Sequence, residues 1–276
     1  MERSAPRAIL LKEEGNRLFK QNDFAGAEGY YSKALIADPS NQSLYTNRAM
    51  ARLKMGLWEG VIDDCSACLK LDANNMKAVY YLSQAHLALR HYDDALKTAL
   101  RARHICVETD DKNLSAATAQ VLQCKKERWD DAEKKRKRET SALEAEVAAM
   151  FERERDEALK EAADMDEGSK TEIREEWQRK AELMTKIFDQ SRTAEERRRK
   201  MPDWAIDDIT FEVMVDPVIT KSGKSYERAS IMEHLRRHQT DPLTREPLQI
   251  SDLRSNLGLK QACDEFLEEN GWAADW

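Results

Sequence analysis

Small and aromatic residues recur along the first third of the chain at a spacing of 34 positions. The series are Gly15, Ala49 and Ser83; Ala27, Val61 and Ala95; Phe24, Trp58 and Tyr92; and Ala34, Cys68 and Ala102. Positions kept small let helix backbones approach closely, and recurring aromatic side chains fill the gaps between units. A period of 34 is typical of helix-turn-helix units that stack into a solenoid. The pattern therefore predicts three paired-helix units over residues 8–110.

Helix boundaries in this array follow from its polar and breaking residues. The first unit is expected to place helices at 9–20 and 24–37, and Asp38-Pro39 ends the second of these. The residue before a proline is disfavoured in the helical conformation. Asn74-Asn75 is expected to have the same breaking role after the second unit.

Residues 111–200 show a different pattern, with dense charge and few apolar positions. The apolar residues are spaced by three or four, which places them on a narrow stripe suited to helix pairing. Proline is absent from this segment, and Gly168 is its only glycine. We expect two antiparallel helices that reverse at 165–169 and mediate a homodimer; a single solvated helix is the alternative.

Residues 201–276 contain four prolines and short apolar runs, which indicate strands and turns. A turn at 222–224 separates two expected strands. Helices are expected at 228–237 and from an Asn256 N-cap to Asn270-Gly271. The predicted fold class is therefore mostly α, with a repeat array, a charged helical hairpin and a small C-terminal α+β domain at 201–276.

The distribution of charge bears on whether the protein binds nucleic acid. The net charge is −7, and residues 201–276 alone contain 8 basic and 15 acidic side chains. No segment is net basic at domain scale, so nucleic acid is not an expected partner. The KKRKR run at 134–138 could suggest RNA binding, but acidic residues flank it, and a solvated helix surface explains it better.

The expected cellular compartment follows from the apolar runs and the cysteines of the sequence. There is no apolar run of membrane length and no signal-peptide core at the N-terminus, so no membrane association is expected. Five cysteines, an odd number, favour a reducing compartment with free thiols. The expected location is the cytoplasm, with the nucleus as a second possibility.

The first helix of each unit is expected to line the concave side of the array. Its inward positions supply Lys12, Asn16 and Lys20; Asn47, Met50 and Lys54; and Lys77, Tyr80, Tyr81 and Gln84. Four of these are lysines, against one inward acid, Glu13. Ammonium and amide donors that converge in this way suit a carboxylate ligand, because charge-assisted hydrogen bonds are about twice as strong as neutral ones.

The stretches LKEEGNRLF, YTNRA and NMKAVYY resemble the tetratricopeptide repeats of chaperone adaptors. That family grips a C-terminal Glu-Glu-Val-Asp peptide through a two-carboxylate clamp. The resemblance implies binding of heat-shock chaperones of the seventy- and ninety-kilodalton classes. It assigns the clamp to Lys12, Asn16, Asn47 and Lys77, the fifth position, often arginine, to Tyr81, and an apolar pocket to Met50, Leu53 and Tyr80.

Metal and redox chemistry are not expected. Cys65 and Cys68 form a C-x-x-C, but no second pair completes a zinc site, and core packing explains them better. A RING-like domain would need eight ligands for two zinc ions, whereas residues 201–276 contain one cysteine and two histidines. No cofactor is predicted.

The pattern ITFEVMVDPVIT, SGKSYER, IMEHL, TDPLTREPL and NLGLKQACDEFLEENGW resembles the U-box family. In that family hydrogen bonds and ion pairs replace the zinc ions of RING domains. The resemblance implies a docking surface for a ubiquitin-conjugating enzyme at Ile209, Phe211, Pro242 and Arg245, with Arg245 also contacting the bound ubiquitin. The alternative for Ile209 and Phe211 is ordinary core burial.

Cys263 lies on the apolar stripe of its expected helix and is interpreted as core, so no covalent intermediate is expected. Catalysis would consist of positioning the loaded enzyme for attack. The repeats, hairpin and U-box together resemble the chaperone-associated ubiquitin ligases, which ubiquitinate misfolded clients held by chaperones. The main alternative is a non-enzymatic adaptor whose C-terminal domain is only a structural cap.

Overall fold

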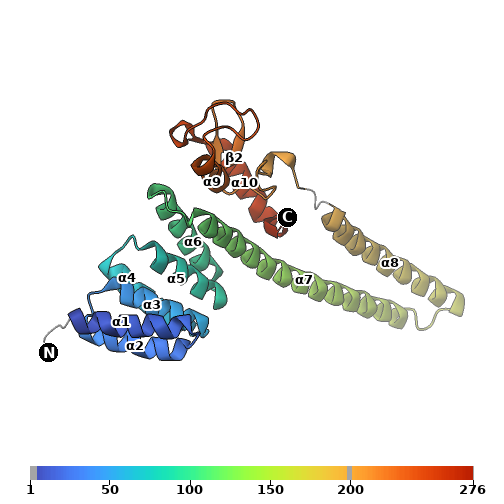
Figure 1. Ribbon diagram of the computed structural model, residues 1–276. Helices are drawn as coiled ribbons and strands as arrows, with labels where there is room; N and C mark the ends of the chain where they lie inside the picture. Colours follow the sequence, from blue (N-terminus) through green and yellow to red (C-terminus); the bar gives the residue numbers. More distant parts are fainter. Residues whose placement is uncertain (1–4, 198–200, 276) are drawn as a thin grey trace. The chain divides into compact units, whose positions relative to one another are not determined.

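The computed structural model describes residues 5–197 and 201–275. Over these residues it contains ten α-helices and one three-stranded sheet. It divides into two compact units, one formed by Met1–Trp129 together with Ala205–Trp276 and the other by Asp130–Trp204 (Figure 1). The mostly helical fold class predicted from the sequence is confirmed.

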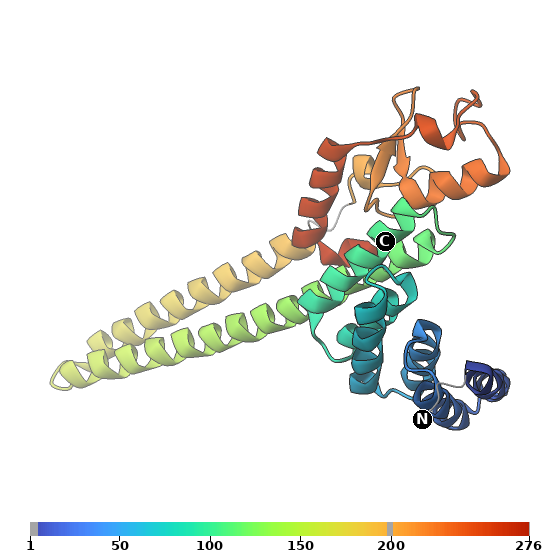
Figure 2. The same cartoon turned by 90° about the vertical axis from the view of Figure 1, so that its left-hand side faces the viewer.

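Three helix pairs form the N-terminal part of the first unit (Figure 2). They are α1 (Ala5–Lys20) with α2 (Phe24–Ala37), α3 (Gln42–Lys54) with α4 (Trp58–Leu71), and α5 (Met76–Ala88) with α6 (Tyr92–Glu108). The predicted bounds of α2 are confirmed. Helix α1 begins four residues earlier than predicted, since Pro6 lies in its first turn, where proline is tolerated.

The residues that recur every 34 positions form the contacts between these helices. Ala27, Ala49, Val61 and Ala95 are all fully buried. At Gly15 a Cβ atom would lie 2.6 Å from Cε1 of Tyr31, closer than real Cβ contacts. Glycine at this position therefore makes room for an aromatic ring from α2.

A buried polar network ties the first two pairs together. Asp64 on α4 is 2% exposed and accepts hydrogen bonds from Arg48 at 3.0 Å (Nε to Oδ2) and Arg52 at 3.1 Å (Nη1 to Oδ2). Arg52 also pairs with Glu28 on α2 at 2.7 Å. Because the Asp64 carboxylate is buried, it depends on these arginines for compensation, and the network joins α2, α3 and α4.

Two long helices follow, α7 (Leu114–Glu161) and α8 (Glu167–Arg197). The first turns of α7 belong to the first unit and are buried there, with Val121 and Cys124 fully inaccessible. The second unit therefore begins at Asp130, inside α7. Within it the two helices run in opposite directions (Figures 1 and 2), and the rings of Phe151 and Trp177 lie 6.0 Å apart. The predicted hairpin is confirmed, and the single-helix alternative is wrong.

The reversal lies at 162–166, about three residues before the predicted position. Asp166 explains the difference, because its carboxylate accepts hydrogen bonds from the Gly168 N–H at 3.1 Å and from the Ser169 hydroxyl at 2.6 Å. These contacts cap the start of α8 and draw Gly168 into its first turn.

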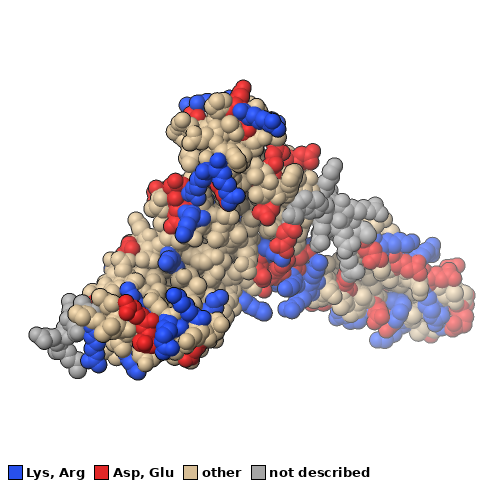
Figure 3. Space-filling model, in the orientation of Figure 1, with Lys and Arg blue, Asp and Glu red and all other residues tan. Residues whose placement is uncertain are grey.

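The surface of the hairpin carries both signs of charge. On the face drawn in Figure 3, basic and acidic side chains are interleaved along α7 and α8. Ion pairs between residues three or four apart contribute to this pattern, for example Arg136–Glu133 and Lys180–Glu176. The KKRKR run lies within this mixed surface, as expected for a solvated helix.

The C-terminal part of the first unit is a small α+β domain. Strands β1 (Pro217–Ile219), β2 (Ser225–Glu227) and β3 (Arg254–Ser255) form an antiparallel sheet in the order β2-β1-β3. The helices α9 (Arg228–Arg237) and α10 (Leu257–Glu269) agree with the predicted bounds, and the Asn256 side chain caps α10. Gly223, with φ +81°, supplies the predicted turn between β1 and β2.

The cysteines have a packing role. All five are buried and free, and Cys65 and Cys68 are both fully buried in the core between α3, α4 and α5. Burial raises the pKa of the Cys68 thiol to about 11. The core interpretation of the C-x-x-C is confirmed. None of the described helices has both the length and the apolar character needed to span a membrane.

Candidate functional site

The first helices of the three pairs carry the predicted peptide-binding residues. Lys12 and Asn16 lie one turn apart on α1, and Asn47 lies on α3. The Asn47 Nδ2 group donates a hydrogen bond to Oδ1 of Asn16 at 3.3 Å. Two of the four predicted clamp residues, from different repeats, are therefore in direct contact.

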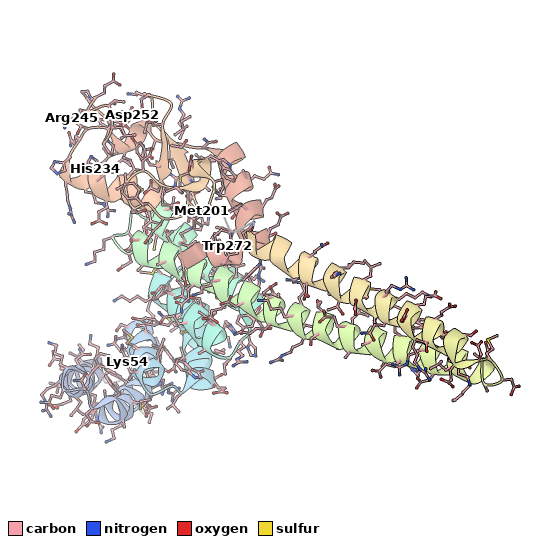
Figure 4. The ribbon with its side chains drawn as sticks, turned by 90° about the vertical axis from the view of Figure 1, so that its right-hand side faces the viewer. Lys54, Met201, His234, Arg245, Asp252 and Trp272 are labelled. Atoms are coloured by element: carbon pink, nitrogen blue, oxygen red, sulfur yellow. The ribbon has the colours of Figure 1, made fainter. Side chains whose placement is uncertain are left out.

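The lysines of the predicted groove have no acidic partner among the described residues. Lys54 and Lys77 are exposed and Lys12 is partly buried, and none of them forms an ion pair within 4.0 Å in the described parts of the chain. Lys54 is labelled in Figure 4, on the last turn of α3. Arg48 and Arg52, by contrast, are paired with acidic side chains of neighbouring helices. These ammonium groups are thus available to an external anion.

The predicted apolar residues take part in core packing as well. Leu53 and Tyr81 pack against the core cluster that contains Ala49 and Cys65. Tyr80 packs against a second cluster, formed by Val79 of α5 and by residues of α6. Burial raises the pKa of Tyr81 above its ordinary value. Met50, on the same helix as Leu53, is partly buried. A ligand at this place would therefore meet side chains held by the core.

Two loops of the C-terminal domain share one design that was not recognised in the sequence. Residues 207–212 read DDITFE and residues 241–246 read DPLTRE, so both match D-x-x-T-x-E. In the first loop the Asp207 N–H donates to the Glu212 carbonyl at 2.9 Å, and in the second the Asp241 N–H donates to the Glu246 carbonyl at 2.8 Å. The signal that identifies them is this short repeated motif, whose two copies are 34 residues apart.

Each loop presents its fifth residue from a left-handed backbone. Phe211 has φ +59° and Arg245 has φ +60°, values that are uncommon for residues other than glycine. Phe211 is 71% exposed, and Arg245 is exposed at the edge of the domain (Figure 4). The predicted docking residues Phe211 and Arg245 therefore occupy equivalent places on two matched loops.

The other two predicted docking residues are less exposed. Ile209 is partly buried against the cluster of Val218 and Tyr226, so core burial accounts for part of its surface. Pro242 is partly buried, and Leu243 beside it is 51% exposed. Leu243 is the counterpart of Ile209 in the second loop and adds an apolar side chain that sequence reasoning missed.

A buried aspartate holds the first loop. Asp207 is fully buried, and its carboxylate accepts hydrogen bonds from the Glu227 N–H at 2.9 Å, the Ser230 hydroxyl at 2.7 Å, and both the N–H and the hydroxyl of Thr210. The carboxylate thus links the loop to β2 and α9. This buried side chain is tolerated because both carboxylate oxygens accept hydrogen bonds.

Asp241 has the same role in the second loop. It accepts hydrogen bonds from the Tyr226 hydroxyl at 2.9 Å, the Ser222 hydroxyl at 3.0 Å, and the N–H groups of Leu243 and Thr244. Burial alone would raise the pKa of Asp241, but these hydrogen bonds outweigh it and hold the pKa below its usual value. The ionised form therefore stabilises the loop.

Within the first unit, a third buried carboxylate joins the last repeat helix to this domain. Asp216 pairs with Arg103 of α6 at 2.8 Å, with Arg228 of α9 at 2.6 Å and with Lys260 of α10 at 3.1 Å. Burial would raise the pKa of Asp216, but the positive charges of Arg103 and Arg228 outweigh it and keep the pKa well below the usual range. One carboxylate thereby connects three helices.

Neither metal nor thiol chemistry is indicated by the described residues. No group of three or more histidine, cysteine or acidic side chains in this part of the chain is arranged to hold a metal ion. Cys263 is fully buried, and burial raises its pKa to about 12, so its thiol stays protonated at neutral pH. The predicted core role of Cys263 is confirmed.

We predict that Asp241→Asn destabilises the C-terminal domain in a pH-dependent way. The folded-state pKa of Asp241 lies below the unfolded value of about 3.9, so its contribution is complete above that pH and is lost as the pH falls through the folded pKa. Calorimetric melting of the full chain should show a loss of about 2 kcal/mol at pH 7 and a smaller loss at pH 3.

The exposed Asp208→Asn in the first loop is the matched control and should change little at either pH. Equal losses for Asp241→Asn at pH 7 and pH 3 would contradict the assigned role of the ionised carboxylate.

The chain is similar to known proteins in both its repeat array and its C-terminal domain. The U-box domain family matches residues 201–272. The Hsp70/Hsp90 co-chaperone CNS1 of Saccharomyces cerevisiae is 31% identical over 138 residues, which is 49% of this chain and 35% of the yeast protein. The solved first TPR of Spaghetti (RPAP3) bound to the HSP90 peptide SRMEEVD shows 30% identity and a TM-score of 0.41, and the match covers 44% of this chain and 92% of that one.

A relative that matches along nearly the full length is the E3 ubiquitin-protein ligase CHIP of Arabidopsis thaliana. It is 30% identical over 271 residues, which is 96% of this chain and 95% of the relative. A match on this scale includes the repeats, the hairpin and the U-box, and it favours a ligase over a non-enzymatic adaptor. The chain belongs to the CHIP family of U-box E3 ubiquitin-protein ligases.

Proposed function

We propose that this ligase works as a co-chaperone. Its groove binds the acidic C-terminal tails of heat-shock chaperones of the seventy- and ninety-kilodalton classes, and its U-box recruits a loaded ubiquitin-conjugating enzyme. Misfolded clients held by the chaperone then receive ubiquitin. The observation that carries the proposal is a set of lysines without acidic partners among the described residues, on the same chain as a U-box.

The chemistry of the groove supports a carboxylate ligand. The ammonium groups of Lys12 and Lys77 are single-charge donors, and the contacting pair Asn16 and Asn47 adds neutral N–H donors. A relative whose similarity covers 49% of this chain is named as an Hsp70/Hsp90 co-chaperone. We assign Met50, Leu53, Lys54, Tyr80 and Tyr81 to the walls of the same site.

The U-box loops support a docking surface for the conjugating enzyme. Phe211 is exposed on one loop and Leu243 on the other, and Ile209 and Pro242, on the same loops, are partly buried. Exposed apolar side chains gathered at one place are typical of interfaces. Arg245, at the place equivalent to Phe211, supplies hydrogen-bond donors at the rim.

We assign the catalytic contribution to positioning. Arg245 would hydrogen-bond both the conjugating enzyme and its ubiquitin, which restricts the thioester to geometries suited to attack. The substrate amine forms the new bond, and the conjugating enzyme's thiolate leaves. Because all five cysteines are buried, we assign no thiol of this chain as a carrier of the ubiquitin.

Tethering explains how such a ligase acts without a client-specific pocket. A chaperone bound in the groove raises the effective concentration of its client near the loaded enzyme. We place this activity in the cytoplasm, with the nucleus as a second location. The five buried, free cysteines support a reducing compartment.

We further propose that the hairpin forms a homodimer. Besides the stripe that includes Phe151 and Trp177, the hairpin exposes a second set of apolar side chains: Leu143, Met150, Leu183 and Ile187, each between 49% and 61% exposed. Leu183 and Ile187 are one helical turn apart, so they share a face. A second copy of the same hairpin would cover them.

The clamp predicts that Lys12→Ala weakens binding of a peptide ending in Glu-Glu-Val-Asp by at least about tenfold, since one charge-assisted hydrogen bond is lost. Isothermal calorimetry on the full chain measures this. Lys97→Ala on α6 keeps the same charge change outside the groove and should bind like the unaltered protein. Unchanged affinity in Lys12→Ala would refute the clamp.

The docking surface predicts that Phe211→Ala lowers autoubiquitination about thirtyfold, the effect of losing about 2 kcal/mol at an aromatic anchor. Leu257→Ala is the matched control, because Leu257 is 72% exposed at the start of α10 and lies outside the two loops. Full activity in both Phe211→Ala and Pro242→Ala would exclude this surface.

The dimer predicts that Leu183→Glu combined with Ile187→Glu halves the mass measured by light scattering, because charge would be buried at the interface. Lys186→Glu, an exposed polar position on the same helix, should leave the mass unchanged. A monomeric mass for the unaltered chain at micromolar concentration would overturn the assignment.

A further inference from the structure

A buried tyrosine behind the groove makes a contact that core packing does not require. Tyr31 lies on α2, the second helix of the first pair, and is 2% exposed. Its hydroxyl donates a hydrogen bond of 2.8 Å to Oδ1 of Asn16, a residue of the predicted clamp. The contact therefore runs from the core of the repeat to its ligand-facing helix.

The first repeat is built for this contact. At the equivalent positions of the next two repeats, 34 and 68 residues on, the chain has Cys65 and Ala99, which lack a hydroxyl donor. Gly15, next to Asn16, is the residue whose missing Cβ leaves space for the Tyr31 ring. Glycine, asparagine and tyrosine thus form one arrangement, found in the first repeat and not in the others.

The two hydrogen bonds on Asn16 decide which way its amide faces. Oδ1 accepts one from Tyr31 at 2.8 Å and a longer one from Asn47 at 3.3 Å. A carbonyl oxygen has two acceptor sites, so both are used. The Nδ2 group, on the other side of the amide, has no hydrogen-bond partner among the described residues. Its two N–H donors remain for a ligand.

We propose that Tyr31 is a positioning residue that selects the charge of the ligand's end. By holding Oδ1 of Asn16 toward the core, its hydroxyl keeps the N–H donors toward the groove, where they favour a carboxylate over a neutral amide. Without it the Asn16 side chain can turn over and place its carbonyl oxygen against the ligand, which repels a carboxylate. This inference rests on the peptide-binding function proposed above.

Tyr31→Phe tests it, because the change keeps the ring and removes only the hydroxyl. Calorimetry on the full chain would use two peptides ending in Glu-Glu-Val-Asp, one with a free terminal carboxylate and one with a terminal carboxamide. We expect the variant to bind the carboxylate peptide about three- to tenfold more weakly and the carboxamide peptide unchanged. The preference between them falls by the same factor.

Tyr30→Phe is the matched control, a neighbouring partly buried tyrosine on the same helix, and should preserve the preference. An equal loss for both peptides in Tyr31→Phe would show a general packing defect and overturn the proposal. So would an unchanged preference in that variant.

A second measurement needs no peptide and separates this inference from the proposed function. In chain labelled with ¹⁵N-asparagine, the side-chain amide signal of Asn16 is identified by its loss in Asn16→Ala. It should shift in Tyr31→Phe and stay in place in Tyr30→Phe, and an unshifted signal would refute the contact. If the unaltered chain binds neither peptide, the proposed function fails, and this measurement alone decides the role of Tyr31.

Discussion

Two buried aspartates determine the shape of the U-box surface. The carboxylate of Asp207 accepts hydrogen bonds from strand, helix and loop, and that of Asp241 from strand and loop. Each loop then projects its fifth residue from a left-handed backbone. Such a backbone is unfavourable for residues other than glycine unless the surroundings enforce it. The exposure of Phe211 and Arg245 therefore depends on two carboxylates that lie beneath the surface.

The groove at the other end of the same compact unit follows a similar principle. The buried hydroxyl of Tyr31 orients the amide of Asn16, which lies on the ligand-facing helix. Between these two regions Asp216 joins α6 to α9 and α10 through three cationic side chains. In the U-box loops and in the groove, a buried polar group fixes the direction of a residue whose own role is at the surface.

Much of the fold could be predicted from local signals. The bounds of α2, α9 and α10 follow from Asp38-Pro39, the Asn256 cap and the apolar spacing, and the repeat period predicts the three pairs. The hairpin turn lies earlier than predicted because the Asp166 carboxylate accepts a hydrogen bond from the N–H of Gly168, which places this glycine in α8. The position of a glycine in the sequence does not by itself predict such a contact. The fate of Leu53, half in the core, also depends on tertiary packing that periodicity cannot resolve.

The parts that sequence reasoning missed depend on distant partners or on weak motifs. Asp216 and Arg103 are more than a hundred positions apart, so no local pattern connects them. The two D-x-x-T-x-E loops differ at all three of their other positions, so their similarity is hard to detect in the sequence. The contact of Asn16 with Asn47 crosses a repeat boundary. A chaperone tail that contacted both amides would link the two neighbouring repeats. An array with bound peptide would therefore resist heat and proteases better than an empty one.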